Sequence, residues 1–177
     1  MSMKTLPQLS VVLGGANSGK SVFAESLVES TVSPLVYLAT AQAWDDEMAA
    51  KIQAHIARRG PRWHTIEAPL DLGAALEGVS ADSVVLLDCV TMWLSNHLLA
   101  QSDCRAQCGE LLAALKRCAA PVVVVTNEVG WSVVPETSLG RAFRRHQGRL
   151  NQDLAAQADL AVLVAAGLPM VLKGALP

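Results

Sequence analysis

Residues 14–21 have the residue types and spacing of a phosphate-binding loop. The segment reads Gly14, Gly15, Ala16, Asn17, Ser18, Gly19, Lys20 and Ser21, which matches the pattern G-x-x-x-x-G-K-[ST] at every fixed position. Glycine at the first and sixth positions permits backbone conformations and a close approach that a Cβ would block. Backbone N–H groups of such a loop surround a phosphate, the lysine reaches the β- and γ-phosphates, and the serine hydroxyl ligates Mg²⁺. A β-rich run precedes the segment and a helical pattern follows it, so we favour a nucleotide-binding loop over an incidental glycine-rich turn.

A second candidate for the metal site follows an apolar run further along the chain. Residues 84–87 are Val-Val-Leu-Leu, and Asp88 comes directly after them. A carboxylate at the end of a strand near a phosphate loop completes the coordination of Mg²⁺. The alternative is that Asp88 only caps the helix expected after it. Because the same chain contains the loop, we favour the metal role.

The nucleobase is not specified by any motif. Regulatory GTPases read guanine with an Asn-Lys-x-Asp segment after a later strand. Here the corresponding run, residues 126–130, reads Thr-Asn-Glu-Val-Gly and has neither the lysine nor the aspartate. The sequence therefore argues against a regulatory GTPase and leaves the choice of base open.

A histidine among arginines is the strongest candidate for a nucleophile. The pattern of residues 46–58 predicts a helix, and Arg58 and Arg59 follow His55 at positions i+3 and i+4, on the same side of that helix. An imidazole beside cations is able to attack a phosphorus atom while the cations neutralise the developing charge. A lone helical histidine is more often structural, so spacing alone does not decide between the two roles.

Two other groupings favour a structural interpretation. Cys104 and Cys108 are four residues apart, but no second ligand pair follows at zinc-site spacing, so we expect reduced thiols. Arg141, Arg145 and Arg149 recur every four residues along a predicted helix, which usually marks a solvated face. The alternatives for this row are a subunit edge or a contact with an anion.

Composition sets the class of protein. The chain has 177 residues, of which 51% are hydrophobic and 17% charged, and its formal net charge is −2. This apolar content excludes a disordered chain, and the charge balance argues against a protein that binds the nucleic-acid backbone. No apolar run is long enough to span a bilayer, and residues 1–6 do not resemble a signal peptide. We expect a soluble cytoplasmic protein.

Strands alternate with helices along the chain, which predicts an α/β fold in one domain over residues 1–177. The predicted strands cover residues 9–13, 35–39, 83–87, 122–126, 160–164 and a short segment near 170–172. The predicted helices cover residues 19–29, 46–58, 71–76, 92–100, 106–118 and 138–158. Continuous apolar strands are typical of a mostly parallel sheet buried on both faces by helices.

Taken together, these segments resemble one known family, the bifunctional cobinamide kinase/cobinamide-phosphate guanylyltransferases of cobalamin biosynthesis. The resemblance extends from the phosphate loop nearly to the end of the chain. Its motifs are residues 14–21, 37–41, 46–48 with Ile52 and His55, 63–67, 87–91 with Asn96, 125–130, 134–136 and 148–152. Asn17 stands where an arginine is common in the family.

The resemblance implies a P-loop NTPase fold of the RecA-like type and two reactions at one nucleotide site. ATP or GTP phosphorylates the aminopropanol hydroxyl of adenosylcobinamide, and GTP then transfers GMP to that phosphate through a GMP–histidine intermediate on His55. The nucleotide contacts that it implies fall on the loop and on Thr40, Ala41, Gln42, Ile56, Ala57, Arg58, Arg59, Glu67 and Asp88. It also implies a homotrimer. The alternatives are a P-loop kinase for another small alcohol and a non-enzymatic GTP-binding module.

Overall fold

The described residues form a seven-stranded sheet whose strand order is β3-β2-β4-β5-β1-β6-β7. The computed structural model describes residues 5–41 and 60–177, so the helix predicted for residues 46–58 lies outside the described part. The strands are β1 (Leu9–Gly14), β2 (Leu35–Ala39), β3 (Trp63–Glu67), β4 (Val84–Asp88), β5 (Val122–Asn127), β6 (Leu160–Ala165) and β7 (Leu168–Lys173). Every neighbouring pair is parallel except β6 and β7, which form an antiparallel hairpin. This confirms the predicted α/β class with a mostly parallel sheet.

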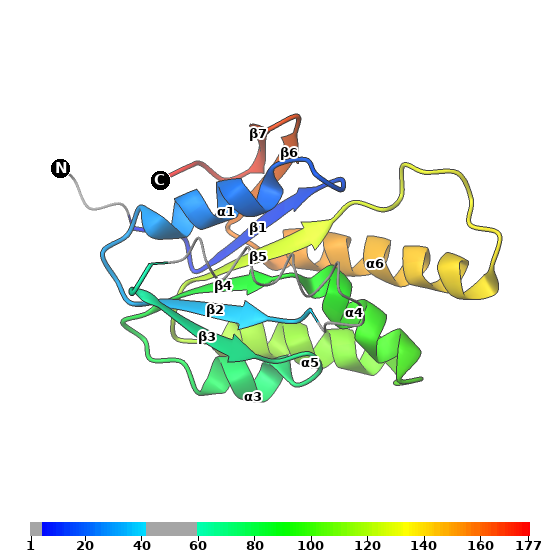
Figure 1. Cartoon of the computed structure of the whole chain (residues 1–177), viewed down its shortest axis with the longest axis horizontal. Helices are drawn as coiled ribbons and strands as arrows, with labels where there is room; N and C mark the ends of the chain where they lie inside the picture. Colours follow the sequence, from blue (N-terminus) through cyan, green and yellow to red (C-terminus); the bar gives the residue numbers. More distant parts are fainter. Residues whose placement is uncertain (1–4, 42–59) are drawn as a thin grey trace.

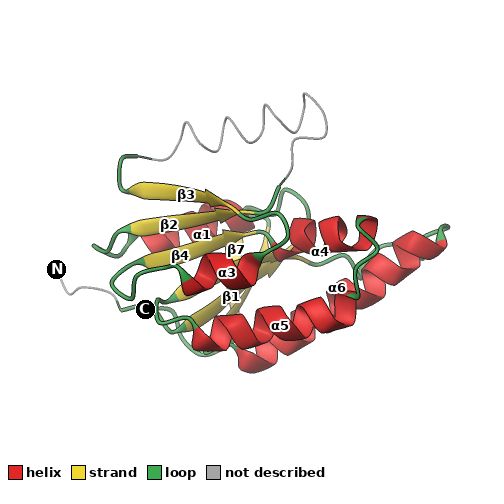
Figure 2. Cartoon of the chain, turned by 90° about the horizontal axis from the view of Figure 1, so that it is seen from below, coloured by secondary structure: helices red, strands yellow, loops and turns green. Residues whose placement is uncertain are grey.

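Helices cover both faces of the sheet (Figures 1 and 2). They are α1 (Lys20–Glu29), α3 (Leu72–Glu77), α4 (Val90–Leu99), α5 (Cys104–Arg117) and α6 (Ser138–Gln157). On one face, α1 packs on alternate residues of the central strands, such as Val12, Val123 and Val125. On the other face, α3 to α6 pack on the residues between them. The central strands are therefore buried on both sides, which explains their continuous apolar runs.

The strand β3 is missing from the sequence prediction. Its residues, Trp63 to Glu67, pair with β2 at the edge of the sheet, and three of the five are exposed to solvent. An edge strand of this kind needs no continuous apolar run, so hydrophobic patterning does not reveal it. Trp63 holds the strand by packing edge-on against Tyr37, with 6.3 Å between ring centroids, and by donating to Glu29 Oε1 at 3.2 Å.

Helix starts follow local capping chemistry. Asp71 accepts a hydrogen bond from Ala74 N at 3.0 Å and begins α3, as its sequence position predicts. Asp103 does the same for α5 by accepting from Arg105 N and Ala106 N, and Thr137 does so for α6 by accepting from Gly140 N. None of the helices within residues 5–41 and 60–177 combines the length and the apolar character needed to cross a bilayer.

The parallel strands bring distant residues to one edge of the sheet. Because the strands from β1 to β6 run in the same direction, their carboxyl ends lie together. Gly14, Ala39, Glu67, Asp88 and Asn127 are the last residues of five of them. In a parallel α/β sheet this is the edge at which ligands bind.

Candidate active site

The phosphate loop joins β1 to α1, as predicted. A Cβ on Gly14 would lie 2.5 Å from Ser18 Oγ and 2.5 Å from the carbonyl oxygen of Val164, which is far too close for any side chain. Gly19 has φ of +91°, in the left-handed region that glycine adopts without steric cost. Asn17 has φ of 55°, and asparagine is among the residues that tolerate this conformation. The residue types at these three positions follow from the backbone.

The loop presents positive potential at its centre. The Lys20 ammonium donates to the carbonyl oxygen of Gly15 at 3.1 Å, so the side chain folds back over the loop. No side chain of a described residue caps the N-terminus of α1. The first N–H groups of that helix and the helix dipole are therefore directed at the space that a phosphate would occupy. Ser21, in the first turn of α1, is half-buried beside them.

A neighbouring hairpin supports the loop from the other side. The β6–β7 turn consists of Ala166 and Gly167, and Gly167 N donates to the carbonyl oxygen of Ser18 at 2.8 Å. The Cα of Gly167 would lie 3.0 Å from a Cβ on Gly19. The hairpin turn and the loop are thus in direct contact, which fixes the shape of the loop.

Asp88 ends β4 on the same edge of the sheet. Its Oδ2 accepts a hydrogen bond from the hydroxyl of Tyr37 at 3.1 Å. Cys89, rather than Asp88, occupies the N-cap position of α4, so the interpretation of Asp88 as a helix cap is wrong. Burial raises the pKa of the Cys89 thiol to about 11, and the Asp88 carboxylate adds to this rise while Lys20 opposes it. The charges of Lys20 and Asp88 therefore both act on the Cys89 thiol.

The donors near Asp88 suit a hard cation. A serine hydroxyl and a carboxylate are oxygen ligands of the kind that Mg²⁺ prefers, and Mg²⁺ completes its shell with phosphate oxygens and water. The described residues contain no group of three or more His, Cys, Asp or Glu side chains placed to hold a metal ion. The hydroxyl of Ser21 and the carboxylate of Asp88 are oxygen donors of the kind that suit Mg²⁺.

Thr40 has a structural role at this edge. Its side chain is buried; its Oγ1 donates to Cys89 O at 2.7 Å and accepts from Cys89 N at 3.0 Å. Its carbonyl oxygen accepts from Asn96 Nδ2 at 2.9 Å. These bonds join the ends of β2 and β4. Ala41, the next residue, is half-buried and is therefore more accessible than the buried Thr40.

Glu67 lies at the far end of the edge. It is exposed, and it pairs with Ala39 in the sheet. Four strand spacings separate β3 from β1 in the sheet order, which amounts to roughly 19 Å. Glu67 is therefore remote from the phosphate loop.

The remaining predicted site residues lie outside the described residues. They are Gln42, His55, Ile56, Ala57, Arg58 and Arg59.

Sequence reasoning missed a buried polar cluster beneath the edge. Gln147 Nε2, on α6, donates to Thr126 Oγ1 at 2.9 Å and to Asn151 Oδ1 at 2.8 Å. Thr126 Oγ1 donates to Asn151 Oδ1 at 2.7 Å, and Asn151 Nδ2 donates to the carbonyl oxygen of Asn127 at 3.0 Å. The only signal in the sequence is two amides four residues apart on the apolar side of a helix, and neither indicates its partner on β5.

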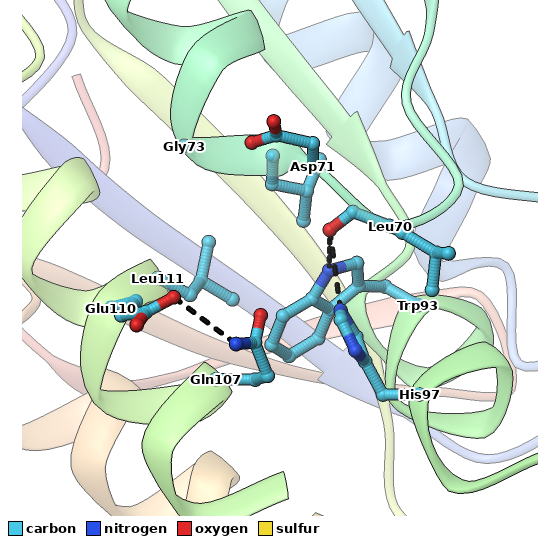
Figure 3. Close-up of a pocket in the computed structure, with 9 residues that line it drawn as sticks. Leu70, Asp71, Gly73, Trp93, His97, Gln107, Glu110 and Leu111 are labelled. Carbon is cyan, nitrogen blue, oxygen red and sulfur yellow. Dashed lines mark hydrogen bonds between the residues drawn. The ribbon is translucent and has the colours of Figure 1, made fainter. Parts of the chain in front are cut away.

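A separate cavity of about 330 Å³ lies among α3, α4 and α5 (Figure 3). Its lining consists of Leu70, Asp71, Leu72, Gly73, Trp93, His97, Gln107, Glu110 and Leu111. The polar groups in it are paired within the protein. The Leu70 carbonyl oxygen accepts from Trp93 Nε1 at 2.7 Å and lies 3.2 Å from His97 Nε2, and Gln107 donates to Glu110. The cavity contains no residue of the phosphate loop and is not part of the candidate site.

Comparison with solved structures agrees with the fold described above. The chain is similar to the assembled ATPase EscN of the enteropathogenic E. coli type III secretion system, with a TM-score of 0.59 and 11% identity. The similarity covers 90% of this chain but only 43% of that chain. At this level of identity it concerns the fold alone, and it agrees with the predicted mostly parallel α/β sheet flanked by helices.

Sequence comparison is more specific. The family described as cobinamide kinase / cobinamide phosphate guanyltransferase matches residues 10–172. The chain is 40% identical over 179 residues to the bifunctional adenosylcobalamin biosynthesis protein CobU of Escherichia coli strain K12, covering 92% of this chain and 98% of that protein. It is 42% identical over 168 residues to the corresponding protein CobP of Pseudomonas aeruginosa, covering 93% and 96%. Since both the family match and the relatives extend over nearly the whole chain, the chain belongs to the cobinamide kinase / cobinamide phosphate guanyltransferase family.

Proposed function

We propose that this protein is a bifunctional enzyme of cobalamin biosynthesis that acts as one domain. It phosphorylates adenosylcobinamide with ATP or GTP, and it then transfers GMP from GTP to the resulting phosphate. The products of the second reaction are adenosylcobinamide-GDP and pyrophosphate. The observation that carries the proposal is the phosphate loop between β1 and α1, facing Asp88 across one intervening strand, in a chain of this family.

In the kinase reaction, the hydroxyl oxygen of adenosylcobinamide attacks the γ-phosphorus of the triphosphate. The bond from that phosphorus to the bridging oxygen breaks, and the nucleoside diphosphate leaves. Lys20 and the N-terminus of α1 stabilise the charge on the phosphate oxygens. The Ser21 hydroxyl and the Asp88 carboxylate would hold Mg²⁺, which would supply positive charge to the triphosphate.

In the guanylyl transfer, a nitrogen of His55 attacks the α-phosphorus of GTP and pyrophosphate leaves. The imidazole must be neutral to attack, and the pKa of about 6.5 of an unperturbed histidine side chain is compatible with a neutral ring at neutral pH. A phosphate oxygen of adenosylcobinamide phosphate then attacks the same phosphorus, and the P–N bond breaks. Arg58 and Arg59 follow His55 at helical spacing and supply positive charge for this step.

The nucleotide contacts of the family extend along the carboxyl edge of the sheet. The loop residues bind the triphosphate, and Thr40, Ala41, Gln42, Ile56, Ala57, Glu67 and Asp88 supply the other contacts. Because Glu67 is roughly 19 Å from the loop by strand spacing, it contacts the nucleoside end rather than the phosphates. Because the hydroxyl and the carbonyl oxygen of Thr40 are engaged within the protein, the half-buried Ala41 is the more available of the two for the ligand.

The histidine intermediate is tested by labelling the protein with GTP that carries ³²P at the α-phosphate. We expect a base-stable, acid-labile adduct on the wild type, as a phosphoramidate requires, and none on His55→Ala. His64→Ala is the matched control because His64 is exposed on β3, away from the phosphate loop. Equal labelling of His55→Ala and wild type contradicts the proposed intermediate.

A γ-phosphate transfer assay tests the kinase half separately. Transfer from γ-labelled ATP or GTP to adenosylcobinamide is expected. Transfer only to a different small alcohol favours a kinase of another specificity. Nucleotide binding with no transfer to either acceptor favours a GTP-binding module without activity.

We also propose that the enzyme is a homotrimer in the cytoplasm. The support for assembly is β7, an edge strand whose residues are all exposed, with Leu168 at 73%, Met170 at 58% and Leu172 at 56%. An exposed apolar edge strand is a surface that another chain covers. The support for the compartment is chemical: the substrates are nucleoside triphosphates, and all four cysteines are free thiols.

Light scattering tests the assembly. We expect three times the mass of one chain for the wild type and a smaller species for Met170→Glu. Val32→Glu is the control, because Val32 is equally apolar and 77% exposed but lies in the turn after α1. A wild type with the mass of one chain rules out the trimer.

A further inference from the structure

The end of β5 lies between the two parts of the nucleotide site. β5 separates β1, which carries the phosphate loop, from β4, which carries Asp88 (Figure 1). Asn127, the last residue of β5, pairs in register with Gly14, the first residue of the loop. The next residue, Glu128, donates its N–H to the carbonyl oxygen of Gly14 at 3.1 Å. Asn127 is therefore fixed relative to the loop by the sheet itself.

The side chain of Asn127 lies on the face of the sheet that α1 covers. Val123 and Val125 pack in the core beneath α1, and successive side chains of a strand alternate between faces. Gly14 is the register partner of Asn127, so its missing side chain would project from the same face. Ser18 Oγ occupies that position, 2.5 Å from where the Cβ would be. With strands spaced roughly 5 Å apart, Asn127 and Ser18 flank Gly14 as neighbours.

The backbone of Asn127 is fully engaged by side chains from the opposite face. Its N–H donates to Thr91 Oγ1 at 2.7 Å, and its carbonyl oxygen accepts from Asn151 Nδ2 at 3.0 Å. Asn151 is held in turn by Thr126 and Gln147. Gln147 Oε1 has no partner among the described residues, but the four hydrogen bonds among Gln147, Thr126, Asn151 and the Asn127 carbonyl oxygen restrict the geometry of Asn127. Two helices, α4 and α6, thus hold the residue in place.

The Asn127 side chain takes no part in this network. Its Oδ1 is buried and has no hydrogen-bond partner within the described part of the chain, and the same is true of Ser18 Oγ. A buried amide oxygen without a partner is costly, and such groups in folded proteins pair with a ligand or water. The protein thus holds Asn127 rigidly by its backbone and leaves its oxygen for another molecule.

The chemistry of the oxygen limits what that molecule is. An amide oxygen only accepts hydrogen bonds, and so do the oxygens of an ionised triphosphate. The phosphates of the nucleotide therefore suit the Ser18 hydroxyl, which donates, but not Asn127 Oδ1. The partner of Asn127 Oδ1 must therefore donate a hydrogen bond, and an alcohol hydroxyl bound beside the phosphate loop is such a donor.

We propose that Asn127 Oδ1 binds the hydroxyl of the alcohol that accepts the γ-phosphoryl group, and that the end of β5 is the acceptor subsite of the kinase reaction. This rests on the proposed function. The hydroxyl donates to Asn127 while its oxygen attacks the γ-phosphorus; the bond to the bridging oxygen breaks and the diphosphate leaves. The hydroxyl proton passes to a transferred phosphoryl oxygen and then to solvent, since an amide is not a base at neutral pH.

The two reactions of the enzyme provide the test. The kinase substrate carries the hydroxyl, whereas the guanylyl acceptor carries a phosphate in its place. Asn127→Ala should therefore lower kcat/KM for phosphorylation of adenosylcobinamide by about 10- to 100-fold, with kcat falling as well as KM rising. GMP transfer to preformed adenosylcobinamide phosphate should change less than about threefold, as should the Kd for GTP in the presence of Mg²⁺. The retained transfer activity also reports that the variant is folded.

Ser132→Ala is the matched control. Ser132 lies in the same segment after β5 and is exposed, and among the described residues its hydroxyl donates to the carbonyl oxygens of Val129 and Val133. It should leave both reactions unchanged. Asn127→Leu, which has a similar shape but no acceptor, should match Asn127→Ala.

Each outcome decides a separate question. An Asn127→Ala variant with normal kinase activity overturns the assignment of the acceptor subsite. Weaker Mg²⁺–GTP binding together with equal loss of both reactions means that Asn127 contacts a metal-bound water, and it overturns the assignment too. A wild type that does not phosphorylate adenosylcobinamide overturns the proposed function, and this assignment with it.

Discussion

The absence of one side chain at Gly14 allows the phosphate loop to close. Two atoms occupy the position of a Cβ there, the hydroxyl oxygen of Ser18 and the carbonyl oxygen of Val164. The serine side chain can rotate away, but the carbonyl belongs to the backbone of β6 and cannot. Gly15, the next residue, has no atom within 4 Å of a Cβ position. Packing therefore requires a glycine at position 14, whereas no contact requires one at position 15.

Gly14→Ala should accordingly be far more damaging than Gly15→Ala. Overpacking at Gly14 should lower the free energy of unfolding by about 1–3 kcal/mol and displace the loop, so that GTP binds much more weakly. Gly15→Ala should change stability by less than about 0.5 kcal/mol. Urea unfolding and isothermal titration with GTP measure both effects. Equal behaviour of the two variants would show that the contact with Val164 does not constrain the loop.

Spacing within a short segment identifies as candidates the residues whose chemistry is local, namely the loop glycines, Lys20 and Asp88, the last residue of β4. It gives no sign of Gln147 or Asn127, because their partners lie 21 and 24 residues away in the chain. A polar residue in a helix is usually solvated, and only the packing of α6 against β5 shows that Gln147 is wholly buried.

At the scale of elements, the β6–β7 hairpin has an unusual turn. Ala166 has φ of 51° and Gly167 has φ of 77°, so both central residues of the two-residue turn are left-handed. This is the conformation of a type I′ turn, which favours asparagine followed by glycine. Glycine satisfies the second position, but alanine at the first adopts the left-handed region at a steric cost.

Ala166→Asn should therefore stabilise the protein. The expected gain is about 0.5–1 kcal/mol in the free energy of unfolding, because asparagine tolerates a positive φ. Urea denaturation of the purified variant and the wild type, at one protein concentration, measures the difference. Ala166→Val, with a branched Cβ, should have the opposite sign. Destabilisation by asparagine would contradict the explanation.

Elements with a continuous apolar run were the easiest to predict. β5 is four buried valines followed by a threonine, and the predicted strand differs from it by one residue at its end. β3 was missed because three of its five residues are exposed and its two half-buried residues, Trp63 and Ile66, pack on opposite faces of the sheet, so neither an apolar run nor an alternating pattern marks the strand. β7 is longer than predicted, because it is exposed along its length and no buried pattern marks its start at Leu168.

For the molecule as a whole, buried thiols make stability depend on pH in the alkaline range. Burial raises the pKa of Cys89 to about 11 from an ordinary value of 9.0. Between these values the unfolded chain has lost the thiol proton and the folded protein has kept it. In this range the folded protein binds the Cys89 thiol proton more tightly than the unfolded chain does. The free energy of unfolding therefore falls as the pH rises from 9 to 11.

Replacing the Cys89 thiol should make the free energy of unfolding depend less steeply on pH. One such group contributes a slope of about 1.4 kcal/mol per pH unit between the two pKa values. Cys89→Ala should lose stability less steeply than the wild type when urea unfolding is followed from pH 8 to pH 10.5. Below pH 9 the curves should run parallel. Identical slopes across the range would mean that the thiol is not protected from ionisation.

The hydrogen bond from Gly167 N to the carbonyl oxygen of Ser18 connects the β6–β7 hairpin with the phosphate loop. One end of the β6–β7 hairpin touches the phosphate loop, and the other strand of the hairpin is the exposed apolar edge. A subunit seated on that edge and a nucleotide in that loop would therefore each favour the same shape of the turn. Linkage is reciprocal, so the factor by which nucleotide tightens assembly equals the factor by which assembly tightens nucleotide binding. Dilution would then weaken the affinity for GTP without any change to a residue that contacts it.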